Sequence, residues 1–427
     1  MVQTHETTRA ASGVAAYRGR LAEVWRQKNF RWYWLSSSLQ GLGQGTQFMV
    51  MGWLVLVITD SSAQLGLVIT LYGIPNVAFL LVAGVIADRF DRRYILMATQ
   101  ATVGGVVTAL AFLTVTGAVA IWHVYTAAFL MGVVQSLSMP ARMTMIGDLV
   151  EQRSILDAVA MQNMAVHVGR MIGPPVAGVI IEVWGVGASM FGIAGCYLVS
   201  VVFVSRIGAI PRSLPPAAQS VFRNFADGVV YIKKNPVVLT VLIITCAFGG
   251  FGMSHLQVVP AMAKDVLGTG AAGIGVLLLG SGIGSLAGSL LLPAISRAHV
   301  YRALLLSLLV FTVVLTLFAW SNWFWATFVL FMLIGTVGVG MVWPLATTMI
   351  QVETPPEVRG RVMGMLQFTP GLHFMGAFPL ALAAGQVGWE VAITGAAGIS
   401  LGTTVWFAFV RRGAPKLNRQ EATATQT

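Results

Sequence analysis

The sequence predicts an all-α membrane protein whose twelve transmembrane helices form two pseudo-symmetric six-helix bundles. Three observations lead to this fold class. Apolar residues make up 56% of the 427-residue chain and charged residues only 10%, against about 25% charged residues in a soluble domain. Twelve apolar segments are long enough to cross about 30 Å of hydrocarbon. The basic residues gather on one side of these segments. A soluble protein with so little charge could not cover its surface, so the chain must be embedded in a membrane.

The expected spans follow one another in order along the chain. In the first half they cover Trp32–Thr59, Ala63–Ala87, Tyr94–Thr116, Ala120–Gly147, Ile155–Ile181 and Val186–Ser205. In the second half they cover Val237–Pro260, Gly273–Ile295, Tyr301–Trp320, Trp323–Ile350, Val362–Gly385 and Trp389–Val410. Each must be helical, because hydrocarbon offers no partner to an open backbone group. The expected parts are therefore a cytoplasmic tail (1–31), a six-helix bundle (32–206), a cytoplasmic linker with an interfacial helix (207–236), a second bundle (237–410) and a cytoplasmic tail (411–427).

The basic residues predict the orientation. Of the 26 Lys and Arg residues, 23 lie in the two tails and the even-numbered loops. Arg142 and Arg170 lie within spans, and only Lys264 lies in a loop on the other side. Cytoplasmic loops carry an excess of positive charge, so both termini are expected in the cytoplasm. The net charge of +11 then reflects topology, and no nucleic-acid partner is expected.

The two halves repeat several features at a similar spacing. The fourth and tenth spans each hold a proline, Pro140 and Pro344, and the loops that follow carry Glu151 and Glu357 close to an arginine. Such repeats are typical of transporters, whose substrate site lies near mid-membrane at the interface between the repeats. We expect the substrate site of this chain there.

The end of the second span carries a dense set of charges. The chain reads GVIADRFDRR from Gly84 to Arg93, which resembles the signature turn of the major facilitator superfamily. The matching residues are Gly84, Asp88, Arg89, Arg92 and Arg93. The motif departs from the family at Asp91, where a glycine is usual, and the second-half turn Arg297–Arg302 has no acidic residue. An ordinary cytoplasmic loop with incidental acidic residues is the alternative.

This resemblance implies a major facilitator fold with a gating latch. Asp88 would face the positive amino end of the eleventh helix. Arg92 would pair with Asp148 at the cytoplasmic end of the fourth helix. The resemblance implies that these contacts form when the cytoplasmic side is closed and break when it opens.

The fifth span resembles the Gly-Pro motif of superfamily antiporters. The matching residues are Gly169, Gly173, Pro174 and Gly178, whereas Pro175 and Val176 depart from the common pattern. Small residues at four-residue spacing let another backbone approach closely. We expect the matching face on the eighth span, at Gly280, Gly284 and Gly288. The motif favours export, although helix packing alone would use the same residues.

Further segments resemble the macrolide-efflux and enterobactin-exporter branch of the superfamily. They are Pro140–Arg142, Leu156–Val159 and Arg359–Gly364. The resemblance implies a bacterial inner-membrane exporter that is driven by the proton gradient.

Polar residues form stripes on three spans, and a polar side chain in hydrocarbon usually has a function. The expected substrate cavity takes Gln40, Gln44 and Gln47 from the first span, Gln135 and Arg142 from the fourth, and Asn163 and Arg170 from the fifth. Glutamines could instead lock neighbouring helices together, and the arginines could bind backbone carbonyls at a kink. His167, one turn before Arg170, is a possible proton carrier or a plain hydrogen-bonding partner.

The function we expect is proton-coupled efflux of amphipathic organic compounds, such as a drug, macrolide or siderophore, by alternating access. No nucleotide-binding loop, catalytic arrangement or metal-ligand spacing is recognisable, so we expect no enzyme, no cofactor and no metal. The expected partners are the substrate, protons and the lipid bilayer, and the expected state is a monomer. The alternatives are an uptake symporter, a lysolipid flippase of the same fold, or a non-transporting membrane sensor.

Overall fold

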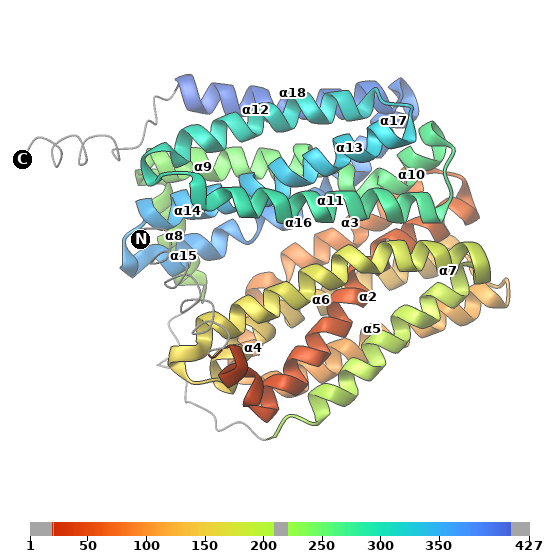
Figure 1. The fold of residues 1–427 in the computed structure, drawn as a ribbon, viewed down its shortest axis with the longest axis horizontal. Helices are drawn as coiled ribbons and strands as arrows, with labels where there is room; N and C mark the ends of the chain where they lie inside the picture. The colour runs from red at the N-terminus through yellow and green to blue at the C-terminus, as the bar shows by residue number, and fades with distance from the viewer. Residues whose placement is uncertain (1–18, 20, 209–220, 411–427) are drawn as a thin grey trace, which may run out of the picture.

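The computed structural model describes residue 19 and residues 21–208 and 221–410. Within these residues every regular element is a helix (Figure 1). The α-helices of the first half are α2 (Lys28–Thr59), α3 (Ser62–Ala78), α4 (Leu80–Arg89), α5 (Arg92–Val115), α6 (Ile121–Leu149) and α7 (Ile155–Ser205). The short 3-10 helix η1 (Gln152–Ser154) precedes α7. The predicted all-helical class is confirmed.

The second half is also helical, and three of its segments are π-helices. After the linker helix α8 (Val221–Lys234) come α9 (Pro236–Ala247), the π-helix η2 (Phe248–Gly252), α10 (His255–Leu267), α11 (Ala271–Leu291), η3 (Leu292–Ala294), η4 (Arg297–His299) and α12 (Val300–Ala319). Then follow α13 (Phe324–Ile334), the π-helix η5 (Gly335–Val342), α14 (Trp343–Glu353), α15 (Pro356–Leu366), α16 (Thr369–Met375), α17 (Ala377–Val387), α18 (Trp389–Val405) and the π-helix η6 (Trp406–Val410).

Nine helical segments of the described chain are long and apolar enough to cross a membrane. One of them, Gln152–Ser205, covers both the fifth and the sixth expected span, because Gly185 turns the chain with a φ of 82°. Glycine suits this turn, since a positive φ is unfavourable for residues that carry a side chain. The expected second span is formed by α3 and α4, and the eleventh by α15, α16 and α17. The count of twelve crossings stays a prediction.

Glycines bring α2 and α7 into close contact. A Cβ atom on Gly169 would lie 2.5 Å from the backbone nitrogen of Leu42, and one on Gly45 would lie 2.5 Å from Cα of Arg170. Neither distance is possible for a real side chain, so only glycine permits this approach. The expected close packing at the Gly169 motif therefore occurs, and the partner of Gly169 is the first span.

The eighth span uses its glycines differently from our expectation. A Cβ atom on Gly284 would lie 1.8 Å from the carbonyl oxygen of Met332, and one on Gly288 would lie 2.0 Å from that of Thr336. This face of α11 thus packs against α13 and η5, and the prediction that it faces the fifth span is wrong. The helix α11 contacts α7 through another face, where Gly178 lies against Ala271.

The two bundles, residues 28–205 and 236–410, meet toward one end of the helices. In Figure 1 they converge near α10 and the turn of α7, and they diverge toward α4 and α15. We call these ends the Lys264 end and the Arg92 end. The hydrogen bonds that join described residues of the two bundles lie at the Lys264 end or near mid-depth, where Thr70 Oγ1 donates to the Phe374 carbonyl over 3.1 Å.

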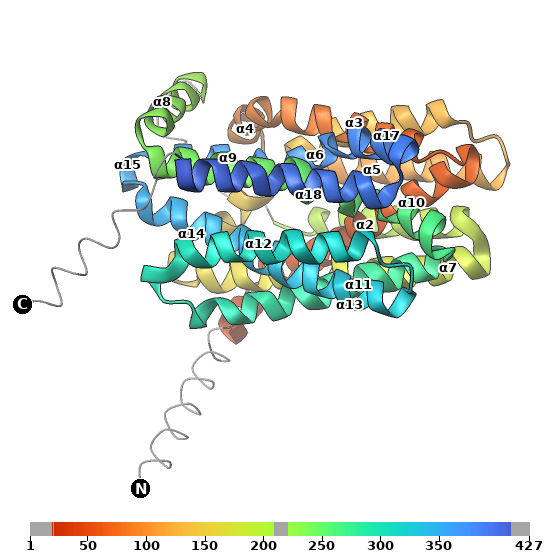
Figure 2. The same ribbon diagram turned by 90° about the horizontal axis from the view of Figure 1, so that it is seen from above.

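The linker helix α8 lies at the Arg92 end, inclined to the long helices (Figure 2). Arg361 Nη1 donates to Asp227 Oδ2 over 3.2 Å, and the Tyr231 hydroxyl donates to the Glu353 carbonyl over 3.2 Å. These contacts tie α8 to α15 and to the end of α14. The helix that we expected in the linker is present, and its position at the membrane surface stays a prediction.

Candidate functional site

A cavity of about 310 Å³ lies between the two bundles. Helices α2 and α7 supply its lining from the first half, and α10, α11, η5 and α16 supply it from the second. Its polar lining residues are Gln44, His167, Arg170, Gln257, Ser281, Ser285 and His373. The rest of the lining is mostly apolar and includes Phe48, Met49, Met171, Leu256, Leu278, Leu286 and Val339. A few polar groups in an apolar cavity are typical of a small-molecule site.

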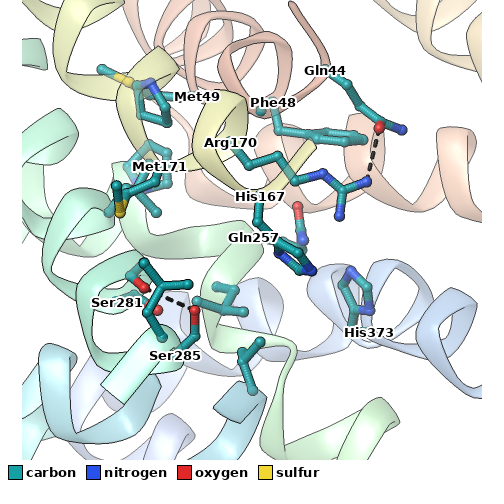
Figure 3. Close-up of a pocket in the computed structure, with 18 residues that line it drawn as sticks. Gln44, Phe48, Met49, His167, Arg170, Met171, Gln257, Ser281, Ser285 and His373 are labelled. Atoms are coloured by element: carbon teal, nitrogen blue, oxygen red, sulfur yellow. Dashed lines mark hydrogen bonds between the residues drawn. The ribbon is translucent and has the colours of Figure 1, made fainter. Parts of the chain in front are cut away.

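Arg170 is the residue that dominates this cavity. The close contact of Gly45 with its Cα atom fixes the backbone of α7 at this point. The side chain is open to the cavity, and Nη2 donates to Gln44 Oε1 over 2.8 Å. Figure 3 shows the guanidinium beside Phe48, with His167, Gln257 and His373 facing the same space. The groups come from both bundles, as expected for a site at the interface of two repeats.

Arg142 does not line this cavity. Its Nη1 donates to Ser37 Oγ over 2.6 Å, and its backbone carbonyl accepts from the Tyr33 hydroxyl over 2.9 Å. Its Nη2 is buried without a hydrogen-bond partner among the described residues. The side chains of Ser37 and Gln44 thus bind the two intramembrane arginines, in place of the backbone carbonyls that we considered as an alternative.

The expected cavity residues fall into two groups. Gln44 and Arg170 line the cavity, whereas Gln40, Gln47, Gln135, Arg142 and Asn163 do not. Gln40 and Gln47 are buried between helices. Gln40 Nε2 lies 3.5 Å from Ser138 Oγ, and Gln47 Oε1 accepts from the Tyr197 hydroxyl over 3.1 Å. These two glutamines therefore link helices, the alternative that the sequence left open.

Gln257 and His373 line the cavity although they were not among the residues expected there. Both belong to short helices of the second bundle, α10 and α16, which follow interruptions of a span. A polar residue inside an apolar span was the available signal for each of them. Without the fold, nothing indicated that they face Arg170. His167 was singled out, and it does line the cavity.

The gating motif lies at the Arg92 end. Arg92 Nη1 and Asp148 Oδ2 form the expected ion pair, and Arg93 Nη2 donates to the Ser205 carbonyl over 2.6 Å. Asp91 accepts from the Arg93 backbone N–H over 2.9 Å, so this departure from the family pattern caps α5. Gly84 and Arg89 lie in α4, and the Asp88 side chain is outside the described residues.

The Arg92–Asp148 pair joins α5 to α6 within the first bundle. It is formed here although the described hydrogen bonds between the bundles lie at mid-depth and at the other end. The expectation that the pair breaks when the Arg92 end opens stays a prediction. A pair inside one bundle moves with that bundle, so it does not report on the separation of the two.

Polar contacts between the bundles gather at the Lys264 end. Lys264 forms an ion pair with Asp60, and this ammonium holds the pKa of the Asp60 carboxyl below its usual range through a hydrogen bond and its charge. Asp265 accepts from Ser62 Oγ over 3.2 Å and from Trp389 Nε1 over 2.9 Å. The sequence marks Lys264 only by its charge, and this network was not predicted from it.

The chain matches known transport proteins over most of its length. Residues 21–424 match the family model described as transmembrane secretion effector. A staphyloferrin A transporter of Staphylococcus aureus is 24% identical over 84% of this chain and 90% of its own length. The multidrug efflux pump Tap of Mycolicibacterium fortuitum is 27% identical, over 81% of this chain and 87% of the pump. The enterobactin exporter EntS of Shigella flexneri is 26% identical, over 73% of this chain and 74% of the exporter.

Solved structures share the fold. The nucleoside transporter NupG has a TM-score of 0.70 at 16% identity and covers 89% of this chain and 98% of its own. A bacterial homologue of the human lysosomal transporter Spinster, solved inward-facing and occupied, has a TM-score of 0.65 at 12% identity over 91% of this chain and 96% of its own. At such identities the likeness shows the fold alone. From the family match and this fold, the chain belongs to the major facilitator superfamily, in its transmembrane secretion effector family, and is a multi-pass membrane transporter and not an enzyme.

Proposed function

We propose that this chain exports amphipathic organic compounds from the bacterial cytoplasm by alternating access, coupled to the proton gradient. The observation that carries the proposal is the cavity between the bundles, which both halves line with a few polar groups among apolar ones. A transporter of this kind opens its site to each side in turn by moving one repeat against the other. The names of the relatives, which move siderophores and drugs, support the substrate range.

The arrangement of the bundles supports a cytoplasm-facing state. If the basic loops are cytoplasmic, as their charge predicts, the Arg92 end faces the cytoplasm and the Lys264 network lies on the outer face. The bundles are then held together on the outside, and the cavity is reached from the cytoplasm. This is the state in which an exporter loads its substrate. We further propose twelve crossings, both termini in the cytoplasm and a monomer in the inner membrane.

The proposed roles follow the position of each residue. Arg170 and Gln44 bind substrate, and His167 carries the proton because it shares their cavity. Arg142, Gln40, Gln47, Gln135 and Asn163 act from outside the lining, as supports or in another state of the cycle. Gly84, Asp88, Arg89, Arg92, Arg93 and Asp148 form the gating motif. Gly169 and Gly173 let α2 and α7 approach closely, and Pro174 and Gly178 lie where α7 packs against α11.

The test is transport by purified protein in liposomes. Vesicles are loaded with a fluorescent amphiphile and placed in an acidic medium, with protein-free vesicles as the control. We expect the pH gradient to speed release only where the protein is present. Release that depends on the protein but ignores the gradient would contradict proton coupling. A gradient that drives accumulation would indicate uptake, and no protein-dependent movement would contradict transport.

A further inference from the structure

We propose that the substrate of this cavity is anionic and binds Arg170 through a carboxylate or a similar oxyanion. This inference rests on the proposed transport function, because it names the substrate class of the same site. It does not rest on proton coupling.

The lining of the cavity carries positive charge and no carboxylate. Arg170 is the charged residue that faces the cavity, and none of the lining residues is Asp or Glu. A guanidinium stays protonated in proteins, so the positive charge is permanent. Its hydrogen-bond partner, the Gln44 carboxamide, is neutral. In the described part of the chain no carboxylate forms an ion pair with Arg170.

A second intramembrane arginine of the first bundle, Arg142, adds positive charge without a carboxylate partner in the described part of the chain. Arg142 also lacks an ion pair among the described residues, and its Nη2 is buried without a partner. The first bundle thus holds two intramembrane guanidinium groups without a carboxylate partner among the described residues, and one of them, Arg170, lines the cavity. A buried charge that lacks a counter-charge is unfavourable. The substrate is the natural source of the missing negative charge.

The surroundings of Arg170 are rich in hydrogen-bond donors. A guanidinium has five N–H donors in a planar fork, and one of them is used by Gln44. The fork matches a carboxylate in two parallel hydrogen bonds. Gln257, His167 and His373 face the same space (Figure 3) and add N–H donors from both bundles. The site is therefore rich in donors, which suits an acceptor group.

The remaining lining defines the rest of the substrate. Phe48, Met49, Leu256, Leu278 and Val339 contribute apolar surface around the polar patch. A hydrocarbon or aromatic body would bury itself there, while the anionic group reached Arg170. A cationic amphiphile of the same shape would face the Arg170 guanidinium, which has no carboxylate partner among the described residues, and like charges at short range repel. The geometry thus separates anionic amphiphiles from cationic ones.

The test compares three probes of similar shape and different charge: pyrenebutyrate, pyrenebutanol and pyrenebutylamine. Binding to the purified full-length protein in detergent is followed near neutral pH by energy transfer from tryptophan to pyrene. We expect the wild type to bind the carboxylate at least about tenfold more tightly than the alcohol or the amine, a factor typical of one charge-assisted hydrogen-bonded pair. Arg170→Gln should lower the affinity for pyrenebutyrate to that for pyrenebutanol and leave the affinity for pyrenebutanol unchanged.

Two further variants keep the test decisive. Arg170→Lys retains the positive charge and should keep most of the preference for the carboxylate probe. The loss of the planar guanidinium donors should weaken the binding of that probe. Arg153→Gln removes a guanidinium from an exposed pair with Glu23 and Glu151, so it controls for net charge and should behave as wild type. Thermal unfolding identifies variants that fail to fold.

The outcomes separate this proposal from the proposed function. Equal binding of the three probes to the wild type, or a carboxylate preference that survives in folded Arg170→Gln, would overturn the anionic substrate and leave transport intact. Binding of none of the probes to folded wild-type protein would overturn the cavity as the substrate site, and with it the basis of the proposed function.

Discussion

Glu182, near the turn of α7, accepts a hydrogen bond from the backbone N–H of Ala272 over 3.1 Å. Ala272 lies in the first turn of α11, where the N–H groups have no partner within the helix. A carboxylate from the first bundle thus caps a helix of the second. The contact joins the two bundles on the same side as the Asp60–Lys264 pair. The family motif implies a similar contact between the Asp88 carboxylate and a helix amino end, at the Arg92 end. Glu182 makes such a contact at the Lys264 end.

We predict that Glu182→Gln favours opening of the Lys264 end. The substitution keeps the acceptor but removes a charge–dipole interaction of about 0.3–1 kcal/mol, which corresponds to a shift in the equilibrium of roughly twofold to fivefold. The measurement is labelling of Ser281→Cys in the cavity by an impermeant maleimide added outside intact cells, in a background without Cys196 and Cys246. Labelling should become faster by that factor.

The control for this experiment is Glu151→Gln. Glu151 is exposed and pairs with Arg153 at the Arg92 end, so its loss should not alter labelling from outside. An equal rate in wild type and Glu182→Gln would remove Glu182 from the closure of this end.

Gly45→Ala should destabilise the protein and disturb Arg170. The added Cβ would lie 2.5 Å from Cα of Arg170, so α2 and α7 must separate, and forcing extra volume into a packed interior typically costs about 1–3 kcal/mol. Thermal unfolding should show a lower midpoint. Gly195→Ala on α7 is the matched control, since its Cβ meets nothing within 4 Å. Equal midpoints for the two variants would show that this contact does not hold the helices.

The Arg92–Asp148 pair should couple more strongly than an exposed pair. The two side chains are only 26% and 19% exposed, so we expect a coupling of about 1–3 kcal/mol, between the values for surface and buried pairs. Thermal unfolding of Arg92→Gln, Asp148→Asn and the double variant measures it. The pair Arg153–Glu151 is 69% and 66% exposed and should couple by less than about 1 kcal/mol. If the stability changes of Arg92→Gln and Asp148→Asn simply add in the double variant, the interaction between the two side chains does not stabilise the protein.

His167→Gln should uncouple transport from the pH gradient. The residue lines the cavity one turn from Arg170, and glutamine keeps a hydrogen-bonding group there but cannot be protonated near neutral pH. In proteoliposomes, proton movement induced by substrate should disappear while downhill counterflow of substrate continues. His123→Gln, at the amino end of α6 and outside the cavity, is the control. Full coupling in the His167 variant would exclude it as the carrier and direct attention to His373.

The sequence predicted the all-helical membrane class, because crossing hydrocarbon imposes a length and a composition on each helix. The pairing of Arg92 with Asp148 followed from the resemblance to a known motif. The small residues Gly280, Gly284 and Gly288 indicated that a neighbouring backbone approaches this face of the eighth span, but they did not indicate which backbone it is. The approaching backbone is that of α13 and η5, and only the packing of the whole bundle decides this.

The glutamines of the first span show a similar limit. At about 100° per residue, Gln47 lies roughly 20° from Gln40 around the helix, and Gln44 lies roughly 40° to the other side. This small difference separates a cavity residue from two that link helices. Spacing alone cannot tell which glutamines of the stripe line the cavity and which link helices, because this depends on where α6, α7 and α16 lie around α2.

The central claim is that the two ends of the molecule open in turn around the Arg170 cavity. Its most direct test is a pair of distances in reconstituted protein, measured by double electron–electron resonance. Labels at Val183 and Thr269 report on the Lys264 end, and labels at Glu151 and Glu357 report on the Arg92 end. On addition of substrate and acid, the account predicts that the first distance lengthens while the second shortens. Two distances that stay fixed, or that lengthen together, would contradict it.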